Sequence, residues 1–173
     1  SLAIGTNALK QSDASFNFAI GYNALTKNTD GSTNIAIGYE SLKENYHGGN
    51  NLAVGLHALA SNKDASGSLA IGTNALKDSV TAYNLAIGYN ALTSNVDGST
   101  NLAMGYESLK ENIRGGNNLA IGLHALVRNR DASGSLAIGT NALKQSDASF
   151  NFAIGYNALT KNTDGSTNIA IGY

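Results

Sequence analysis

The sequence predicts an all-β fold, a parallel β-solenoid whose coils are 16 or 17 residues long. Three observations predict it. The string x-A-[IVM]-G recurs at near-constant spacing, a coil of this length is shorter than any strand-plus-helix repeat, and the 173 residues include 20 glycines but no proline. Because proline removes a backbone donor, its absence is expected where almost every N–H belongs to a hydrogen-bonded ladder.

The motif glycines define the repeat, since their spacings run 16, 17, 17 and 17 residues before the pattern starts again. Four coils form a 67-residue cassette: residues 1–67 and 68–134 differ at 16 positions, and the partial cassette 135–173 repeats 1–39 without change. A fixed internal period overrides a domain count drawn from length. We therefore expect residues 1–173 to be a single continuous solenoid segment of a longer chain.

The elements of one coil follow in order along residues 84–100. Residues 85–88 form a first apolar stretch and are predicted to be a strand, Ala91 and Leu92 form a second, and the polar run 93–100 returns the chain through Asp-Gly, a dipeptide suited to turns. A short helix over 40–44, and its counterpart over 107–111, is the alternative, because helix-forming residues cluster there. We favour two strands, since equivalent coils lack this composition and stacked coils must match.

The first strand has two different faces. Period-two alternation places large aliphatic side chains on one face and Ala and Gly on the other. A coil this short encloses little volume, so we expect the lumen to admit only Ala and Gly, with the aliphatic side chains turned outward as a ladder. The alternative is a wider coil with Leu and Ile inside. The predicted outward ladder comprises Leu2, Ile4, Phe18, Ile20, Ile35, Ile37, Leu52, Val54, Leu69, Ile71, Leu85 and Ile87.

An uncovered ladder of this length would be a contiguous exposed apolar patch, which soluble monomers avoid. We therefore predict a homo-oligomer, most simply a homotrimer packed about the ladder. The wider coil with its aliphatic side chains inside would instead be a monomeric solenoid.

Asparagine marks each coil twice, just before the first strand and again in the return, as at Asn84 and Asn95. Asparagine tolerates the left-handed region and bonds its own backbone, which predicts a corner role for both rows. Stacked amides would also allow hydrogen bonds from coil to coil.

Residues 84–92, Asn-Leu-Ala-Ile-Gly-Tyr-Asn-Ala-Leu, and residues 68–76, Ser-Leu-Ala-Ile-Gly-Thr-Asn-Ala-Leu, resemble the haemagglutinin-type repeats in the heads of trimeric autotransporter adhesins. They are also similar to tail-fibre repeats of phages and phage-like injection systems. The resemblance covers essentially the whole chain, and it implies a left-handed parallel β-roll wound as a tight trimer. The adhesin coil is usually shorter, and the additional residues here, around 27–33, favour the fibre relatives.

The sequence does not point to an active site, and we expect no enzyme, no metal and no cofactor. His57 and His124 occupy the same cassette position about 19 Å apart along the axis, without Cys or a second His nearby. Carboxylates such as Asp30 and Glu40 recur with the cassette, whereas an active site is needed once. Residues 48–50 lack the Lys-Ser/Thr ending of a phosphate loop, and no calcium-binding Gly-Gly-x-Gly-x-Asp string occurs.

Charge and hydropathy argue against two partner classes. A formal net charge of −1 with 13% charged residues leaves no basic field for nucleic acid and no polybasic face for anionic lipid. No apolar run approaches the roughly 18–20 residues of a spanning helix. We expect neither nucleic-acid binding nor membrane insertion.

The residue after each motif glycine cycles through Thr, Tyr, Tyr and Leu. Tyrosine joins an apolar face to a polar tip, so the paired tyrosines are suited to stacking on a sugar or to packing against a neighbouring chain. The candidate surface contacts are Tyr22, Tyr39, Tyr89, Tyr106, Tyr156 and Tyr173.

We expect this chain to be a structural shaft or head segment of an extracellular trimeric fibre, on a bacterial cell surface or in a virion-like particle such as a phage-like tail. The alternative is an adhesin-type module that binds cell-surface glycans or another host surface. An ice-binding solenoid is a lesser alternative, because the Thr-Tyr-Tyr-Leu cycle breaks the flat row of small residues that ice binding requires.

Overall fold

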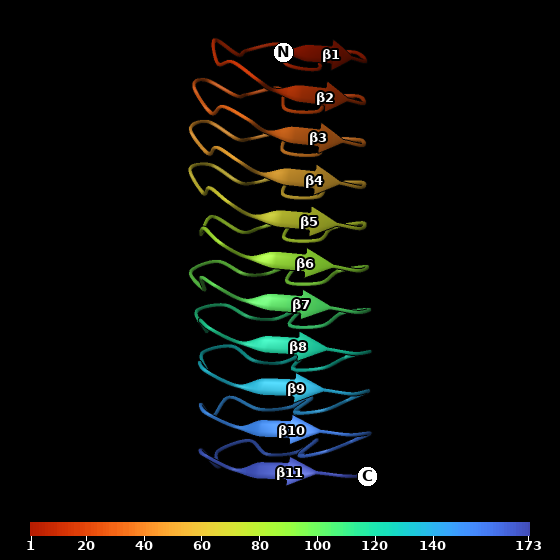
Figure 1. The fold of residues 1–173 in the computed structure, drawn as a ribbon, viewed down its shortest axis with the longest axis vertical. Coiled ribbons are helices and arrows are strands. Elements are labelled where there is room, and N and C mark those ends of the chain that lie inside the picture. Colours follow the sequence, from red (N-terminus) through yellow and green to blue (C-terminus); the bar gives the residue numbers. More distant parts are fainter.

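The computed structural model describes all 173 residues and shows a rod of stacked coils with the two termini at opposite ends (Figure 1). One parallel sheet of eleven strands, in chain order, runs along the rod. The all-β parallel solenoid of about 17-residue coils is therefore confirmed, and no helix is present. The strands are β1 (Leu2–Ile4), β2 (Phe18–Ile20), β3 (Ile35–Ile37), β4 (Leu52–Val54), β5 (Leu69–Ile71), β6 (Leu85–Ile87), β7 (Leu102–Met104), β8 (Leu119–Ile121), β9 (Leu136–Ile138), β10 (Phe152–Ile154) and β11 (Ile169–Ile171).

Each strand pairs with the next in strict register, so that equivalent residues of successive coils stack. In β5 and β6, for example, Leu69 lies beside Leu85, Ala70 beside Ala86 and Ile71 beside Ile87. The strands run across the rod axis (Figure 1), so the hydrogen bonds between paired strands run along it.

The motif glycine ends each strand because its backbone adopts a conformation that side chains disfavour. Gly105 has a φ of 132°, and a Cβ placed on it would lie 2.5 Å from the carbonyl oxygen of Gly122 in the next coil. Only glycine allows the chain to turn here while the coils remain at hydrogen-bonding distance.

The second apolar stretch is not a strand, and this prediction was wrong. Asn90 and Leu92 have φ values of 53° and 50°, in the left-handed region, so the chain passes through successive turns. The helical alternative over 40–44 is also wrong, since Glu40 and Leu42 have φ values of 55° and 48°. These turns still pair from coil to coil, as where Leu92 N–H donates to the Ser108 carbonyl at 3.0 Å.

Because of this pairing, the backbone ladder extends well beyond the strands. Of 100 backbone hydrogen bonds, 20 have both partners in strands, and the other 80 have at least one partner in a turn or loop. The solenoid is held together around much of its perimeter rather than along one face.

The core contains leucine as well as alanine, so the expectation of a lumen restricted to Ala and Gly was wrong. Ala86 of the strand and Ala91 and Leu92 of the turn segment are all fully buried, and the same three positions repeat along the rod. Left-handed turns direct both residues of the Ala-Leu pair inward, which a second strand would not do. The alternative of a wider coil with the strand Leu and Ile side chains inside is also wrong. The strand residues Leu85 and Ile87 point away from this core and are only half-buried.

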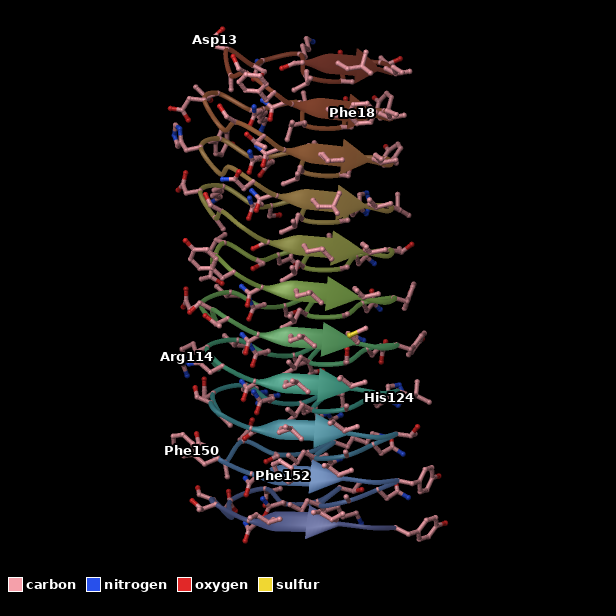
Figure 2. The ribbon with its side chains drawn as sticks, in the orientation of Figure 1. Asp13, Phe18, Arg114, His124, Phe150 and Phe152 are labelled. Carbon is pink, nitrogen blue, oxygen red and sulfur yellow. The ribbon has the colours of Figure 1, made fainter.

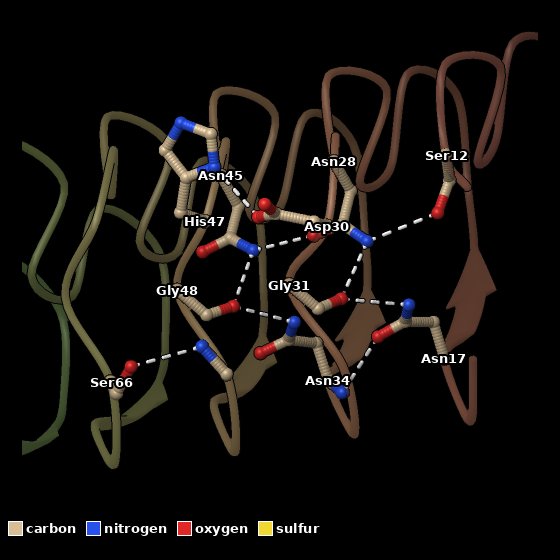
Figure 3. A network of polar contacts seen from close by, with 11 residues as sticks. Ser12, Asn17, Asn28, Asp30, Gly31, Asn34, Asn45, His47, Gly48 and Ser66 are labelled. Carbon is tan, nitrogen blue, oxygen red and sulfur yellow. Dashed lines mark hydrogen bonds and ion pairs between the residues drawn. The ribbon is translucent and has the colours of Figure 1, made fainter. Parts of the chain in front are cut away.

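The two asparagine rows are buried and do more than turn corners. We call them the amide rails, because their side chains are linked from coil to coil along the rod. In the row before the strands, the Asn34 backbone N–H donates to Asn17 Oδ1 at 2.8 Å, and Asn17 Nδ2 donates to the Gly31 carbonyl at 2.9 Å. In the return row, Asn45 Nδ2 donates to Asn28 Oδ1 at 2.7 Å (Figure 3). Each amide therefore satisfies a buried backbone group and links two coils, which is what a polar core residue requires.

The amide rails change at the 16-residue coils, where serine replaces asparagine. Ser68 and Ser79 occupy the two rows in the coil that opens the second cassette, and both are buried. Asn62 Oδ1, which precedes Ser79 in its row, is buried without a hydrogen-bond partner. The junction between cassettes is therefore the least satisfied level of the interior.

Candidate functional surfaces

The outward ladder forms an apolar strip along the face that carries the strands. Both outward positions of all eleven strands hold apolar side chains, from β1 to β11. Their side chains lie half-buried against axial neighbours, and Ile71 and Met104 in the middle of the rod are 37% and 38% exposed. In Figure 2, Phe18 and Phe152 lie on this face. A strip of this kind favours contact with another apolar surface.

The tyrosine edge lies where the strands end, directly after the motif glycines. Tyr22 and Tyr39 stack with ring centroids 5.1 Å apart and planes at 17°, and the His57 ring meets Tyr39 edge-on at 5.7 Å. The second cassette repeats this arrangement with Tyr89 and Tyr106, whose centroids lie 5.2 Å apart. The predicted contacts Tyr22, Tyr39, Tyr89, Tyr106, Tyr156 and Tyr173 thus form three stacked pairs. No second aromatic ring stacks on the other face of the first ring of each pair.

A chain of polar side chains follows one residue after the tyrosine edge, and the sequence interpretation missed it. Asn7 Nδ2 donates to Asn23 Oδ1 at 3.0 Å, and Asn23 Nδ2 donates to Glu40 Oε1 at 3.3 Å. His57 Nε2 lies 3.6 Å from Glu40 Oε2, and Lys43 Nζ donates to Glu40 Oε1 at 3.0 Å. The run therefore spans four coils, from Asn7 to His57, and Glu40 contacts side chains on both sides. The signal was available as the cycle Asn, Asn, Glu, His at this position.

Glu40 and its equivalent in the second cassette, Glu107, are held in their charged form. Partial burial acts to raise the pKa of Glu40, but the hydrogen bonds from Lys43 and Asn23 outweigh it and leave the pKa below its ordinary value. The hydrogen bond from Lys110 lowers the pKa of Glu107 in the same way. The pattern is that of a repeated ion-pair network.

A shallow polar groove opens beside each glutamate. In the second cassette Glu107, Lys110, Glu111 and His124 line it together with Lys144. The equivalent residues Glu40, Lys43, Glu44, His57 and Lys77 line a groove in the first cassette. Such grooves offer hydrogen-bonding groups of both charges but no apolar floor.

The opposite side of the rod carries the returns and their own ion pairs. His47 Nδ1 lies 2.6 Å from Asp30 Oδ1, and this hydrogen bond raises the pKa of His47 (Figure 3). Arg114 takes the place of His47 in the second cassette and pairs with Asp131 at 2.7 Å, which lowers the pKa of Asp131. All four side chains are largely exposed, so these pairs contribute little to stability.

The structure shows no group of three or more His, Cys, Asp or Glu side chains that would hold a metal ion. It contains no helix long and apolar enough to cross a membrane.

Three exposed aromatic residues, which the sequence interpretation missed, stand at the corner just before β2, β6 and β10. We call Phe16, Tyr83 and Phe150 the corner aromatics; they are 80%, 69% and 65% exposed. Their φ values of 61°, 61° and 60° are unfavourable for bulky side chains. Figure 2 shows Phe150 on the return side of the sheet, opposite the edge where His124 lies. The sequence signal is an aromatic residue ending every 16-residue coil.

Comparison with models of protein families, with curated proteins and with solved structures finds no match to this chain.

Proposed function

We propose that the chain is a structural shaft segment of an extracellular trimeric fibre, wound left-handed, with the four-coil cassette as its unit. The observation that carries the proposal is the outward ladder. An unbroken apolar strip along the whole rod is typical of an interface and not of a surface left in water. Two further copies turned toward a common axis would cover it.

The mechanism is mechanical. Coil-to-coil backbone pairing and the buried amide rails stiffen each rod, while burial of the outward ladder joins the rods. Burial of apolar surface contributes about 25 cal/mol per Å², so many half-exposed aliphatic side chains give a strong, non-directional attraction between chains.

The mass of the protein in solution tests this proposal. We expect an assembly of three chains, and a stable monomer near 17.8 kDa that does not aggregate would overturn it. Ile87→Asp places a charge on the outward ladder and is expected to dissociate the assembly. Ser94→Asp, on the polar segment that follows the Ala-Leu turns and outside the outward ladder and its two edges, is the matched control and is expected to leave the mass unchanged.

A second candidate is an adhesin-type module that binds cell-surface glycans at the tyrosine edge. The favouring observation is that Tyr89 and Tyr106 are half-exposed and lie next to the polar groove at Glu107. Aromatic faces beside hydrogen-bonding groups suit sugar rings. A glycan array probed with this chain and with Tyr89→Ala tests this function. We expect the unmodified chain to bind a glycan and Tyr89→Ala to bind it more weakly, and no binding of the unmodified chain to any glycan would refute it.

A further inference from the structure

We propose that the corner aromatics fix the axial register of the assembled chains by inserting into notches on the tyrosine edge of the neighbouring copy. The inference rests on the proposed function, since it requires parallel copies packed about the outward ladder. It adds to that function a specific contact between the corner aromatics and the tyrosine edge, and it gives the four-coil cassette a role.

The first step is geometric. Each strand face has a start edge, where the corner residues precede the strands, and an end edge, where the tyrosines follow the motif glycines. In any ring of parallel copies whose ladders face a common axis, the start edge of one copy meets the end edge of the next, because such contacts are heterologous. The corner aromatics of one copy therefore face the tyrosine edge of its neighbour.

The second step is the level along the axis. Tyr83 precedes β6 and Tyr89 follows it, so both lie at the level of one strand that runs across the rod (Figure 1). The Tyr83 ring packs toward the preceding coil, since a Cβ on Gly67 would lie 3.0 Å from its Cδ1 and Cε1 atoms. The ring thus spans the levels of β5 and β6. Phe150 has the same relation to Gly134.

The end edge carries the smallest residue of its cycle at that level. Thr73 follows the motif glycine at the level of β5, between Leu56 on one side and Tyr89 on the other. Threonine has a smaller side chain than leucine or tyrosine, so the proposed notch lies at Thr73, next to the Tyr89 face that does not stack on Tyr106. The Tyr83 ring of one copy is placed to fill the notch at Thr73 of the next. Thr6 and Thr140 provide the same notch for Phe16 and Phe150.

The third step is why such a device is needed. The outward ladder is nearly the same in every coil, so a shift of one coil, about 4.8 Å, still sets aliphatic side chains against aliphatic side chains. Uniform strands specify register weakly. In one register the aromatic ring meets a threonine, and in the other registers it meets a tyrosine or a leucine. The ring therefore favours one register over the others. The ring and the notch each occur once in four coils, which is the length of the cassette.

The first two cassettes differ around the corner aromatic but keep an aromatic residue there. Residues 13–16 read Asp-Ala-Ser-Phe, and the equivalent residues 80–83 read Val-Thr-Ala-Tyr, so all four differ. Aromatic character nevertheless persists at the last position, although the backbone there is left-handed and the side chain is mostly exposed. Strain of this kind persists where other contacts compensate for it.

The test uses engineered disulfides, since the chain contains no cysteine. Asn50→Cys on the start edge with Leu56→Cys on the end edge is the in-register pair, and Asn50→Cys with Thr73→Cys is the pair offset by one coil. Within one chain, Asn50 and Leu56 are six residues apart across β4, about 20 Å in extended backbone, which is far beyond disulfide reach. Any disulfide therefore joins two chains.

With the corner aromatics present, we expect the in-register pair to cross-link under mild oxidation and the offset pair to cross-link at least about tenfold less. With Phe16→Ser, Tyr83→Ser and Phe150→Ser combined, we expect the two pairs to cross-link to similar extents. In an assembly of three-chain mass, failure of the in-register pair would overturn the inference, and so would an unchanged preference in the serine variant. A monomeric mass would instead refute the proposed function, and the inference with it.

A second variant keeps the test decisive if the serine variant does not fold. Filling the notches with Thr6→Tyr, Thr73→Tyr and Thr140→Tyr places at the end edge a residue that other coils already carry there. We expect this variant to lose in-register cross-linking between Asn50→Cys and Leu56→Cys. Retention of that cross-link at its original yield would overturn the inference.

Discussion

Replacement of Asn112 by leucine is expected to show how much a buried amide rail contributes to stability. Asn112 Nδ2 donates to Asn95 Oδ1 at 2.6 Å and to the Gly115 carbonyl at 2.7 Å, and Asn112 Oδ1 accepts from Asn129 Nδ2 at 2.8 Å. Leucine has a similar size but makes none of these bonds. At about 1 kcal/mol for each hydrogen bond, the free energy of unfolding should fall by about 3 kcal/mol.

Urea denaturation followed by circular dichroism measures this loss. Taking an m-value of about 2 kcal/mol per M, the midpoint of Asn112→Leu should lie about 1.5 M below that of the unmodified protein. Ser99→Ala, on an exposed side chain, is the control, and its midpoint should stay within about 0.25 M. Asn112→Ser should fall between the two, since serine occupies this row in the 16-residue coils.

A midpoint for Asn112→Leu no lower than that of the Ser99→Ala control would refute the reasoning. It would mean that the stacked amides only replace the hydrogen bonds they make to water in the unfolded chain. The coils would then be held by the backbone ladder and the Ala-Leu core alone.

Three further outcomes follow from the geometry. Gly105→Ala should lower the thermal midpoint by several degrees, because its Cβ would meet the Gly122 carbonyl and its φ of 132° disfavours any side chain; an unchanged midpoint would show that the coils separate freely. Leu109→Ala should cost about 2–5 kcal/mol in urea denaturation, since the side chain is fully buried, and a loss under 1 kcal/mol would contradict its place in the core. The hydrogen bond from Lys110 lowers the pKa of Glu107, so its stabilisation is present above the ordinary glutamate pKa of 4.5 and is lost as the pH falls through the lower folded value. Urea midpoints of the unmodified protein and Glu107→Gln should therefore converge as the pH is lowered below 4.5, and a constant difference would contradict the assignment.

The strands and the outward direction of their aliphatic residues were predictable because a period-two pattern and a short coil leave few other arrangements. The second strand failed for a specific reason. Leu92 adopts a φ of 50°, a conformation that leucine rarely takes, and an adjacent alanine and leucine look the same in a strand and in successive left-handed turns. The buried leucines of the core were missed for the same reason.

Some of the candidate surfaces could also be predicted from the sequence, and others could not. The tyrosine pairs were found from their period, but the polar run through Glu40 was not, because its members are chemically different and their link appears only when coils stack in register. Phe16 was overlooked inside a segment interpreted as a polar return. Its exposure depends on a left-handed corner that no local pattern encodes.

The direction of the hydrogen bonds has a consequence for how the rod bears tension. A pull along the axis loads all bonds between two neighbouring coils together, so they must break at once, while the interfaces themselves are connected in series. The strength of such a rod is set by its weakest interface and does not rise with length. The cassette junction, where Asn62 Oδ1 lacks a partner opposite Ser79, is the level at which fracture should begin. Added cassettes would extend its reach without making it harder to break.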